Sequence, residues 1–214
     1  MPEARNPAGA QMRLYYSPQS SNSRRALLVA RHLGAPIELV VIDLRNPADR
    51  ARLVALNPNS KIPVLEHGDF VLWESRAIMQ YLADQVPGQT IYPADLRQRA
   101  DVNRWLFWCA HHWAPAIGIF TWEHVIKPYL KLGDPDPQAI ERGKREFGTV
   151  ARVLDGHLAG RDWLAGSGLS IVDFGLATPL MRAVEAQVPV AEHANIAAWL
   201  ARVQGFEAWK ATQP

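Results

Sequence analysis

Cysteine is almost absent from this chain of 214 residues, which contains only Cys109. A single cysteine excludes an intramolecular disulfide and any metal site built from several thiolates. The chain also lacks a run of 18 apolar residues, so the sequence offers no candidate for a membrane-spanning helix. The motifs G-x-x-x-x-G-K-[ST], G-x-G-x-x-G, H-E-x-x-H and G-x-S-x-G are missing too. Their absence removes the nucleotide-binding, zinc-protease and serine-hydrolase functions that use them.

An excess of charge of one sign is also lacking, because 23 Lys and Arg face 21 Asp and Glu, which gives a formal net charge of +2. This balance argues against nucleic acid as the main partner. Hydrophobic residues make up 48% of the chain, which is typical of a globular protein. The first eleven residues are polar, contain Pro and Gly, and carry no apolar leader, so we expect a loose tail and a cytoplasmic protein.

The first half of the chain alternates between strand-like and helix-like patterns. We expect strands at 12–16 and 37–43, helices at 22–33, 47–56 and 75–84, and a hairpin within 61–75 that turns at His67-Gly68-Asp69. This order predicts an α/β layer with a mixed sheet over residues 12–86.

After a linker at 87–94 the strand-like runs disappear. Helical patterns cover 95–130, 137–158, 171–186 and 193–210, so we expect an all-helical second domain over 95–214. At its centre the segment "GLSIVDFG" places Ser170 as an N-cap and Asp173 three residues later. This pair predicts a capping box that stabilises the fold and takes no part in catalysis.

Three serines, Ser20, Ser21 and Ser23, stand at the entrance of the helix predicted for 22–33. One serine is enough for an N-cap, so capping explains the segment only in part. A helix N-terminus presents free N–H groups and a partial positive charge, which can hold an anion such as a thiolate. The sequence leaves both interpretations open.

Two further segments could bind a peptide-like ligand. In "NPNSKIPVL" (57–65), Pro63 directly precedes a strand and must lie at an edge, at a bulge or in a cis peptide bond. Lys61 beside it could meet a carboxylate or could be an ordinary solvated lysine. In "LWESRAI" (72–78), Ser75 could be a plain N-cap, or Glu74 and Ser75 could bind the ammonium and carboxylate of an amino acid.

These three segments, in this order and spacing, resemble the cytosolic glutathione transferases of the serine type, theta and especially delta. The likeness runs over residues 12–210 and implies a thioredoxin-like first domain, an all-α second domain and glutathione as co-substrate. It also implies a homodimer.

The resemblance assigns roles to individual residues. Ser20 matches the serine that hydrogen-bonds the glutathione sulfur, with Ser21 as its nearest rival. Ile62, ahead of the cis-Pro63 that the resemblance implies, would bind the cysteinyl backbone. Glu74 and Ser75, supported by Arg76, would take the γ-glutamyl end. Lys61 is closer to the theta pattern than to the delta pattern, and the contact to the glycyl carboxylate stays open.

The aromatic segment "RWLFWCAHHWAPAIGIF" (104–120) is the candidate site for a second substrate. Core packing between helices would explain about half of its large side chains. The resemblance implies that some of Trp108, His112, Trp113 and Phe120 line a site for a small hydrophobic electrophile. Neighbouring His111 and His112 point apart on a helix, so we expect no metal site.

The sequence therefore predicts a glutathione S-transferase that activates the thiolate of glutathione for attack on an apolar electrophile. The alternative is a non-catalytic member of the same fold, a ligand carrier or protein-interaction module. Retention of all three segments favours the enzyme. We expect no nucleic acid or membrane partner.

Overall fold

The structure is a computed structural model, and it describes residues 11–213. The chain divides into two compact units: the first runs to Gln89 and also takes in the chain from Thr212 on, and the second spans Thr90–Ala211. Of the tail predicted for residues 1–11, all but Gln11 lies outside the described residues.

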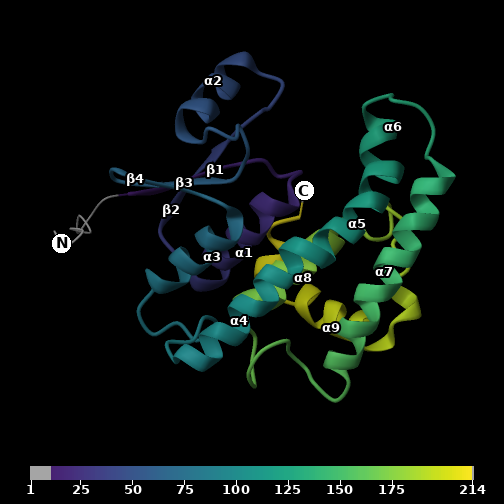
Figure 1. Cartoon of the computed structure of the whole chain (residues 1–214). Coiled ribbons are helices and arrows are strands. Elements are labelled where there is room, and N and C mark those ends of the chain that lie inside the picture. Colours follow the sequence, from purple (N-terminus) through teal and green to yellow (C-terminus); the bar gives the residue numbers. More distant parts are fainter. Residues whose placement is uncertain (1–10, 214) are drawn as a thin grey trace. The chain divides into compact units, whose positions relative to one another are not determined.

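The first unit is a four-stranded sheet with three helices, which confirms the predicted mixed α/β layer (Figure 1). Strand order is β2-β1-β3-β4; β1 and β2 run parallel, whereas β3 is antiparallel to both β1 and β4. Its elements are β1 (Met12–Tyr16), α1 (Ser21–Leu33), β2 (Ile37–Val41), α2 (Pro47–Leu56), β3 (Val64–His67), β4 (Phe70–Trp73) and α3 (Ser75–Asp84).

Both faces of this sheet are covered, so neighbouring residues of the two central strands, β1 and β3, are buried together. Helices α1 and α3 pack against each other on one face and α2 lies on the other (Figure 1). On the α2 side, Tyr15, Ile42, Leu53 and Val64 form one buried apolar cluster. Leu14, next to Tyr15 in β1, is also fully buried. A slip by one residue would exchange the side chains on the two faces, and the close packing of each set against its own neighbours opposes that slip.

The second unit is helical throughout its described residues, as predicted. Its elements are α4 (Leu96–Trp108), the π-helical turn η1 (Cys109–Trp113), α5 (Ala114–Thr121), a second π-helical turn η2 (Trp122–Ile126), α6 (Lys127–Tyr129), α7 (Pro137–Leu158), α8 (Ile171–Ala177), the 3₁₀ turns η3 (Thr178–Arg182) and η4 (Val190–Glu192), α9 (Ala194–Gln204) and α10 (Glu207–Lys210).

The first long helix differs from the uninterrupted one predicted over 95–130. Two π-helical turns interrupt it, and each is followed within two residues by a proline, Pro115 or Pro128. Proline inside a helix has no N–H to donate and its ring clashes with the carbonyl four residues earlier. A wider turn relieves that clash: the N–H of Ala114 bonds to Cys109 and that of Lys127 to Trp122, both five residues back.

The last two predicted helices are also shorter than expected. The segment predicted as helix over 171–186 is α-helical only to Ala177, where the 3₁₀ turn η3 with Pro179 takes over. The segment predicted over 193–210 is divided at Gly205 into α9 and α10. Apolar periodicity runs through these breaks, so it extends a predicted helix past its real end.

The predicted capping box at the start of α8 is present, and Asp173 also connects distant parts of the second unit. Its fully buried carboxylate accepts hydrogen bonds from the backbone N–H and hydroxyl of Ser170, at 2.8 and 3.0 Å. It also accepts from the backbone N–H of Leu164 at 3.0 Å and from the indole N–H of Trp199 at 2.9 Å. Asp173 therefore fixes the preceding loop and α9 to the start of α8.

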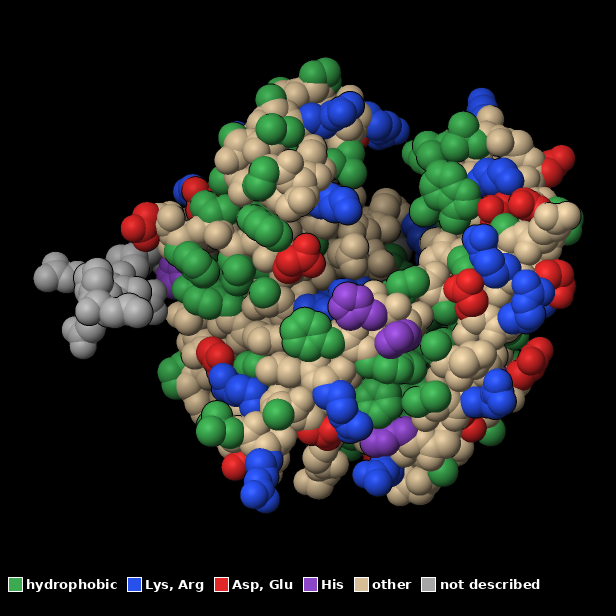
Figure 2. All heavy atoms as spheres, in the orientation of Figure 1, with side chains coloured by type: hydrophobic (Ala, Val, Ile, Leu, Met, Phe, Trp, Pro, Cys, Tyr) green, Lys and Arg blue, Asp and Glu red, His purple; other side chains and the backbone are tan. Residues whose placement is uncertain are grey.

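Basic and acidic side chains are interspersed over the face of the molecule seen in Figure 2. Exposed ion pairs among the described residues include Arg13 with Glu38 and Lys144 with Glu141. Exposed pairs of this kind contribute little to stability, about 0–1 kcal/mol each. Within residues 11–213 none of the helices has the length and apolar character needed to cross a membrane.

Candidate active site

Serines form the entrance of α1, and the hydroxyls of Ser20 and Ser23 each accept a backbone hydrogen bond there. Ser20 is the N-cap, with φ −92° and ψ 119°, and its hydroxyl oxygen accepts from the backbone N–H of Ser23 at 3.2 Å. The hydroxyl oxygen of Ser23 accepts from the backbone N–H of Ser17 at 3.3 Å, and Ser23 is fully buried. Ser20 and Ser21 are half-buried and reach the surface. Ser23 therefore shapes the turn, whereas Ser20 and Ser21 are accessible to a ligand.

Ser20 can cap the helix and contact a ligand at the same time. A serine hydroxyl has lone pairs that accept and one O–H that donates. In Ser20 the oxygen accepts from the helix, and the O–H can donate to an anion placed beyond it. Capping and anion binding, the two interpretations that the sequence offers, are therefore compatible at this residue.

The electrostatics at this end of α1 favour an anion. The first turn carries no acidic residue, and two buried arginines, Arg24 and Arg25, follow directly. Burial lowers the pKa of Arg24 to about 10, which still leaves it cationic at neutral pH. The partial positive charge of the helix N-terminus adds to these cations.

The segment before β3 contains a cis peptide bond between Ile62 and Pro63, one of the three possibilities offered by the sequence. Pro63 is buried, Ile62 is half-buried and Lys61 is exposed. Asn57, 3% exposed, holds this segment: its side-chain amide donates to the backbone carbonyl of Lys61 at 2.7 Å. Asn57 was not among the predicted site residues, because its position in an Asn-Pro turn signals only a loop.

The entrance of α3 differs from that of α1, because no side chain caps it. Glu74, not Ser75, occupies the N-cap position, and Ser75 is the first helical residue, 5% exposed. Glu74 has φ 74° and ψ 105°, a backbone conformation that costs a residue with a side chain about 1–3 kcal/mol. Strain of this kind is concentrated at ligand sites. The uncapped backbone N–H groups at the start of α3, together with the side chain of half-buried Arg76, can bind a carboxylate.

Strand register brings the three segments to one end of the sheet. Tyr15 near the end of β1 pairs with Val64 at the start of β3, and Val64 pairs with Trp73 at the end of β4. The loop that leaves β1 towards Ser20, the loop that enters β3 and the turn that leaves β4 therefore lie at the same end of the strands. Segments from three separate parts of the first unit's sequence therefore lie at one end of the sheet.

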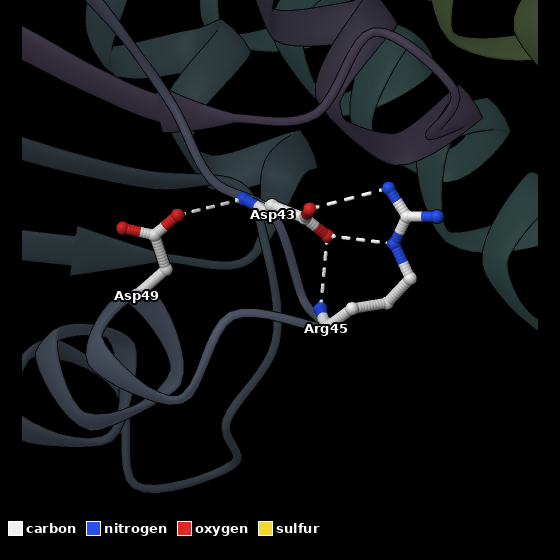
Figure 3. A network of polar contacts seen from close by, with 3 residues as sticks. All are labelled: Asp43, Arg45 and Asp49. Carbon is white, nitrogen blue, oxygen red and sulfur yellow. Dashed lines mark hydrogen bonds and ion pairs between the residues drawn. The ribbon is translucent and has the colours of Figure 1, made fainter.

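The loop that leads from β2 into α2 is held by its own polar contacts, shown in Figure 3. Asp49 of α2 accepts from the backbone N–H of Asp43 at 2.9 Å. The guanidinium of Arg45 donates to both carboxylate oxygens of Asp43, at 3.1 and 3.2 Å, and lowers the pKa of that carboxyl. These exposed contacts order the approach to α2 in the first unit.

The residues predicted for an electrophile site divide into two groups within the second unit. Trp113 is fully buried: its indole N–H donates to the carbonyl of Leu176 at 2.9 Å, and its ring packs against Phe147. Phe120 is also buried, so core packing accounts for both Trp113 and Phe120. Trp108 is half-buried and His112 is exposed, and their rings are neighbours.

Comparison with protein families agrees with this architecture. The model of the glutathione S-transferase N-terminal domain matches residues 10–84, and that of the glutathione S-transferase C-terminal domain matches residues 137–202. Glutathione S-transferase 3 of Zea mays is 31% identical over 209 residues, which cover 95% of this chain and 93% of the maize protein. Human glutathione S-transferase theta-2B is 32% identical over 200 residues, which cover 91% of this chain and 81% of the human protein.

Solved structures give the same result. A theta-class glutathione S-transferase from the citrus canker pathogen Xanthomonas axonopodis pv. citri, solved with glutathione bound, superposes with a TM-score of 0.85 at 27% identity, covering 96% of this chain and 98% of that one. Glutathione transferase F7 from Populus trichocarpa superposes with a TM-score of 0.84, also at 27% identity, covering 94% and 97%. The sequence relatives and the shared two-unit architecture show that this chain belongs to the glutathione S-transferase family.

Proposed function

We propose that this protein is a glutathione S-transferase that binds glutathione at the entrance of α1 and directs its thiolate at a small hydrophobic electrophile. The observation that carries the proposal is the geometry of Ser20. Its hydroxyl oxygen accepts from the first turn of α1 while its O–H is available to a ligand, at a helix N-terminus with no acidic residue. Membership of the family makes the thiolate of glutathione the anion that fits this place.

The other proposed site residues bind the remaining parts of glutathione. In the proposal, the backbone of Ile62 beside Pro63 binds the cysteinyl unit. Glu74 accepts from the γ-glutamyl ammonium, while Ser75 and Arg76 donate to its carboxylate. The strained backbone of Glu74 and the uncapped start of α3 support these roles.

Two further assignments concern Lys61 and Ser21. Exposed Lys61, whose backbone carbonyl is held by Asn57, is proposed for the glycyl carboxylate. Ser21 is the alternative to Ser20 as the residue that contacts sulfur, since both are half-buried at the same helix end.

The chemistry needs no general base among these residues. A free thiol of cysteine type has a pKa of about 8.5, and donors around the sulfur favour the ionised form. The bound thiol releases its proton to solvent, and the thiolate sulfur then forms a bond to the electrophilic carbon. The leaving group departs with the bonding electrons. The protein contributes ionisation and positioning.

The electrophile is proposed to contact Trp108 and His112, the two members of the predicted set that reach the surface. The sequence also offers Trp113 for this site, but its complete burial fits a supporting position behind Trp108, on which its ring stacks. We also propose a homodimer and a cytoplasmic location, the latter because of the single, buried cysteine.

Calorimetric titration with glutathione, together with thiolate absorbance followed against pH, tests the proposal. We expect saturable binding and a bound thiol whose pKa lies at least one unit below that of free glutathione. S-methylglutathione is the matched control: it should bind at the same site and give no thiolate signal. Binding without a change in thiol pKa would instead support a non-catalytic carrier, and absence of binding would refute both the enzyme and a glutathione carrier.

A further inference from the structure

The last residues of the chain contact α1. Thr212 belongs to the first compact unit, although the 122 residues before it form the second. Its hydroxyl oxygen accepts a hydrogen bond from the Nε–H of Arg24 at 3.4 Å. Thr212 is 6% exposed and Arg24 is 3% exposed, so this contact is closed to solvent. Burial of a guanidinium is costly unless its N–H groups find acceptors, and Thr212 supplies one.

Arg24 connects this contact to the candidate site. Its backbone N–H donates to the carbonyl of Ser20 at 2.9 Å, which is the hydrogen bond that closes the first turn of α1. The hydroxyl oxygen of Ser20 accepts from Ser23, one residue before Arg24. Two hydrogen bonds therefore link Thr212 to Ser20, through a side chain that has little space in which to move.

We propose that Thr212 is a positioning residue for the reaction at Ser20: by anchoring Arg24, it holds the first turn of α1 in the geometry that presents the Ser20 hydroxyl. This inference rests on the proposed function. Thr212 does not touch the ligand in this account, and it acts only through Arg24 and the helix. Displacement of a catalytic group by a fraction of an ångström is enough to lower a rate severalfold.

The test compares Thr212→Val, which keeps the branched shape but loses the hydroxyl, with Thr212→Ser, which keeps the hydroxyl. In Thr212→Val we expect faster hydrogen exchange at the amides of Ser23 and Arg24, a raised pKa of the bound thiol and a loss in kcat/KM of about tenfold. Thr212→Ser should restore all three to within about twofold of the wild type. A chain that stops after Ala211 should behave like Thr212→Val or lose more.

The outcomes separate this inference from the proposed function. If the wild type binds glutathione and lowers its thiol pKa, but Thr212→Val leaves exchange and thiol pKa unchanged, the positioning role is refuted and the function stands. Equal losses in Thr212→Val and Thr212→Ser would also refute it, because the hydroxyl would then not matter. If the wild type does not bind glutathione at all, the proposed function fails and this inference fails with it.

Discussion

At the scale of single residues, the start of α1 shows how one segment can both cap a helix and present a hydroxyl to an anion. The sequence predicts a serine-rich helix entrance and offers Ser20 and Ser21, but it cannot assign hydrogen bonds to individual hydroxyls. In the structure the Ser23 hydroxyl accepts a hydrogen bond from the turn before the helix, and the Ser20 hydroxyl caps the helix. Asn57 was missed for a related reason: its bond to the carbonyl of Lys61 depends on a loop conformation that no local pattern encodes.

The strained backbone of Glu74 allows stability and glutathione binding to be tested separately. Replacement of Glu74 by glycine removes a side chain from a residue at φ 74°, so we expect the free energy of unfolding to rise by about 1 kcal/mol. The same substitution removes the proposed acceptor for the γ-glutamyl ammonium, so KM for glutathione should rise about tenfold or more. Glu74→Gln is the control, because it keeps the backbone strain and loses only the charge. It should weaken binding without stabilising the protein. Equal thermal stability of both variants would contradict the strain argument.

At the scale of elements, the sequence predicts most of the first unit. The helices at 47–56 and 75–84 are confirmed with the predicted bounds, because apolar periodicity and neighbouring prolines agree there. It predicts the second unit less well. Pro115 and Pro128 lie inside an apolar pattern, and the pattern alone does not say whether a helix kinks, stops or widens around a proline.

Close packing of α5 against α7 gives the second prediction. A Cβ at Gly143 of α7 would lie 3.1 Å from a side-chain carbon of Ile119 and 3.2 Å from one of Phe120. We expect Gly143→Ala to destabilise the protein by about 1–2 kcal/mol in urea unfolding, since overpacking outweighs the gain in helix propensity. Gly148 in the same helix has no atom within 4 Å of such a Cβ, so Gly148→Ala should stabilise by about 0.5–1 kcal/mol. Effects of the same sign would argue against the packing explanation.

Asp173 gives the third prediction. Asp173→Ala leaves the buried donors of Leu164, Ser170 and Trp199 without their acceptor, and we expect a loss of about 3 kcal/mol or more in urea unfolding. Ser170→Ala removes one hydroxyl and should cost about 1 kcal/mol. Affinity for glutathione should stay within about twofold of the wild type in both. A variant with wild-type stability and no activity would show that Asp173 takes part in catalysis and not only in stabilising the fold.

At the scale of the whole molecule, the sequence predicts an α/β part followed by a helical part, because the alternation of patterns stops after Pro93. It could not predict that the chain from Thr212 on belongs to the first unit. Docking of a terminal residue depends on two partners about 190 positions apart, and periodicity carries no information over that distance.

The proposed homodimer gives the fourth prediction. Sedimentation equilibrium at micromolar concentration should give twice the 23.9 kDa mass of one chain. We expect this mass with and without glutathione, since the proposed site lies within one chain. A monomeric mass at these concentrations would refute the homodimer without affecting the assignment of Ser20.

The proposed contact between the Ser20 hydroxyl and the thiolate of glutathione can be measured through the pH dependence of kcat/KM in Ser20→Ala and Ser21→Ala. We predict that Ser20→Ala lowers kcat/KM about 100-fold and raises the apparent pKa of the bound thiol towards about 8.5. Ser21→Ala, one residue further into the same helix, should leave the profile within about threefold of the wild type. An unchanged profile in Ser20→Ala, or a loss confined to Ser21→Ala, would refute the contact between Ser20 and the thiolate.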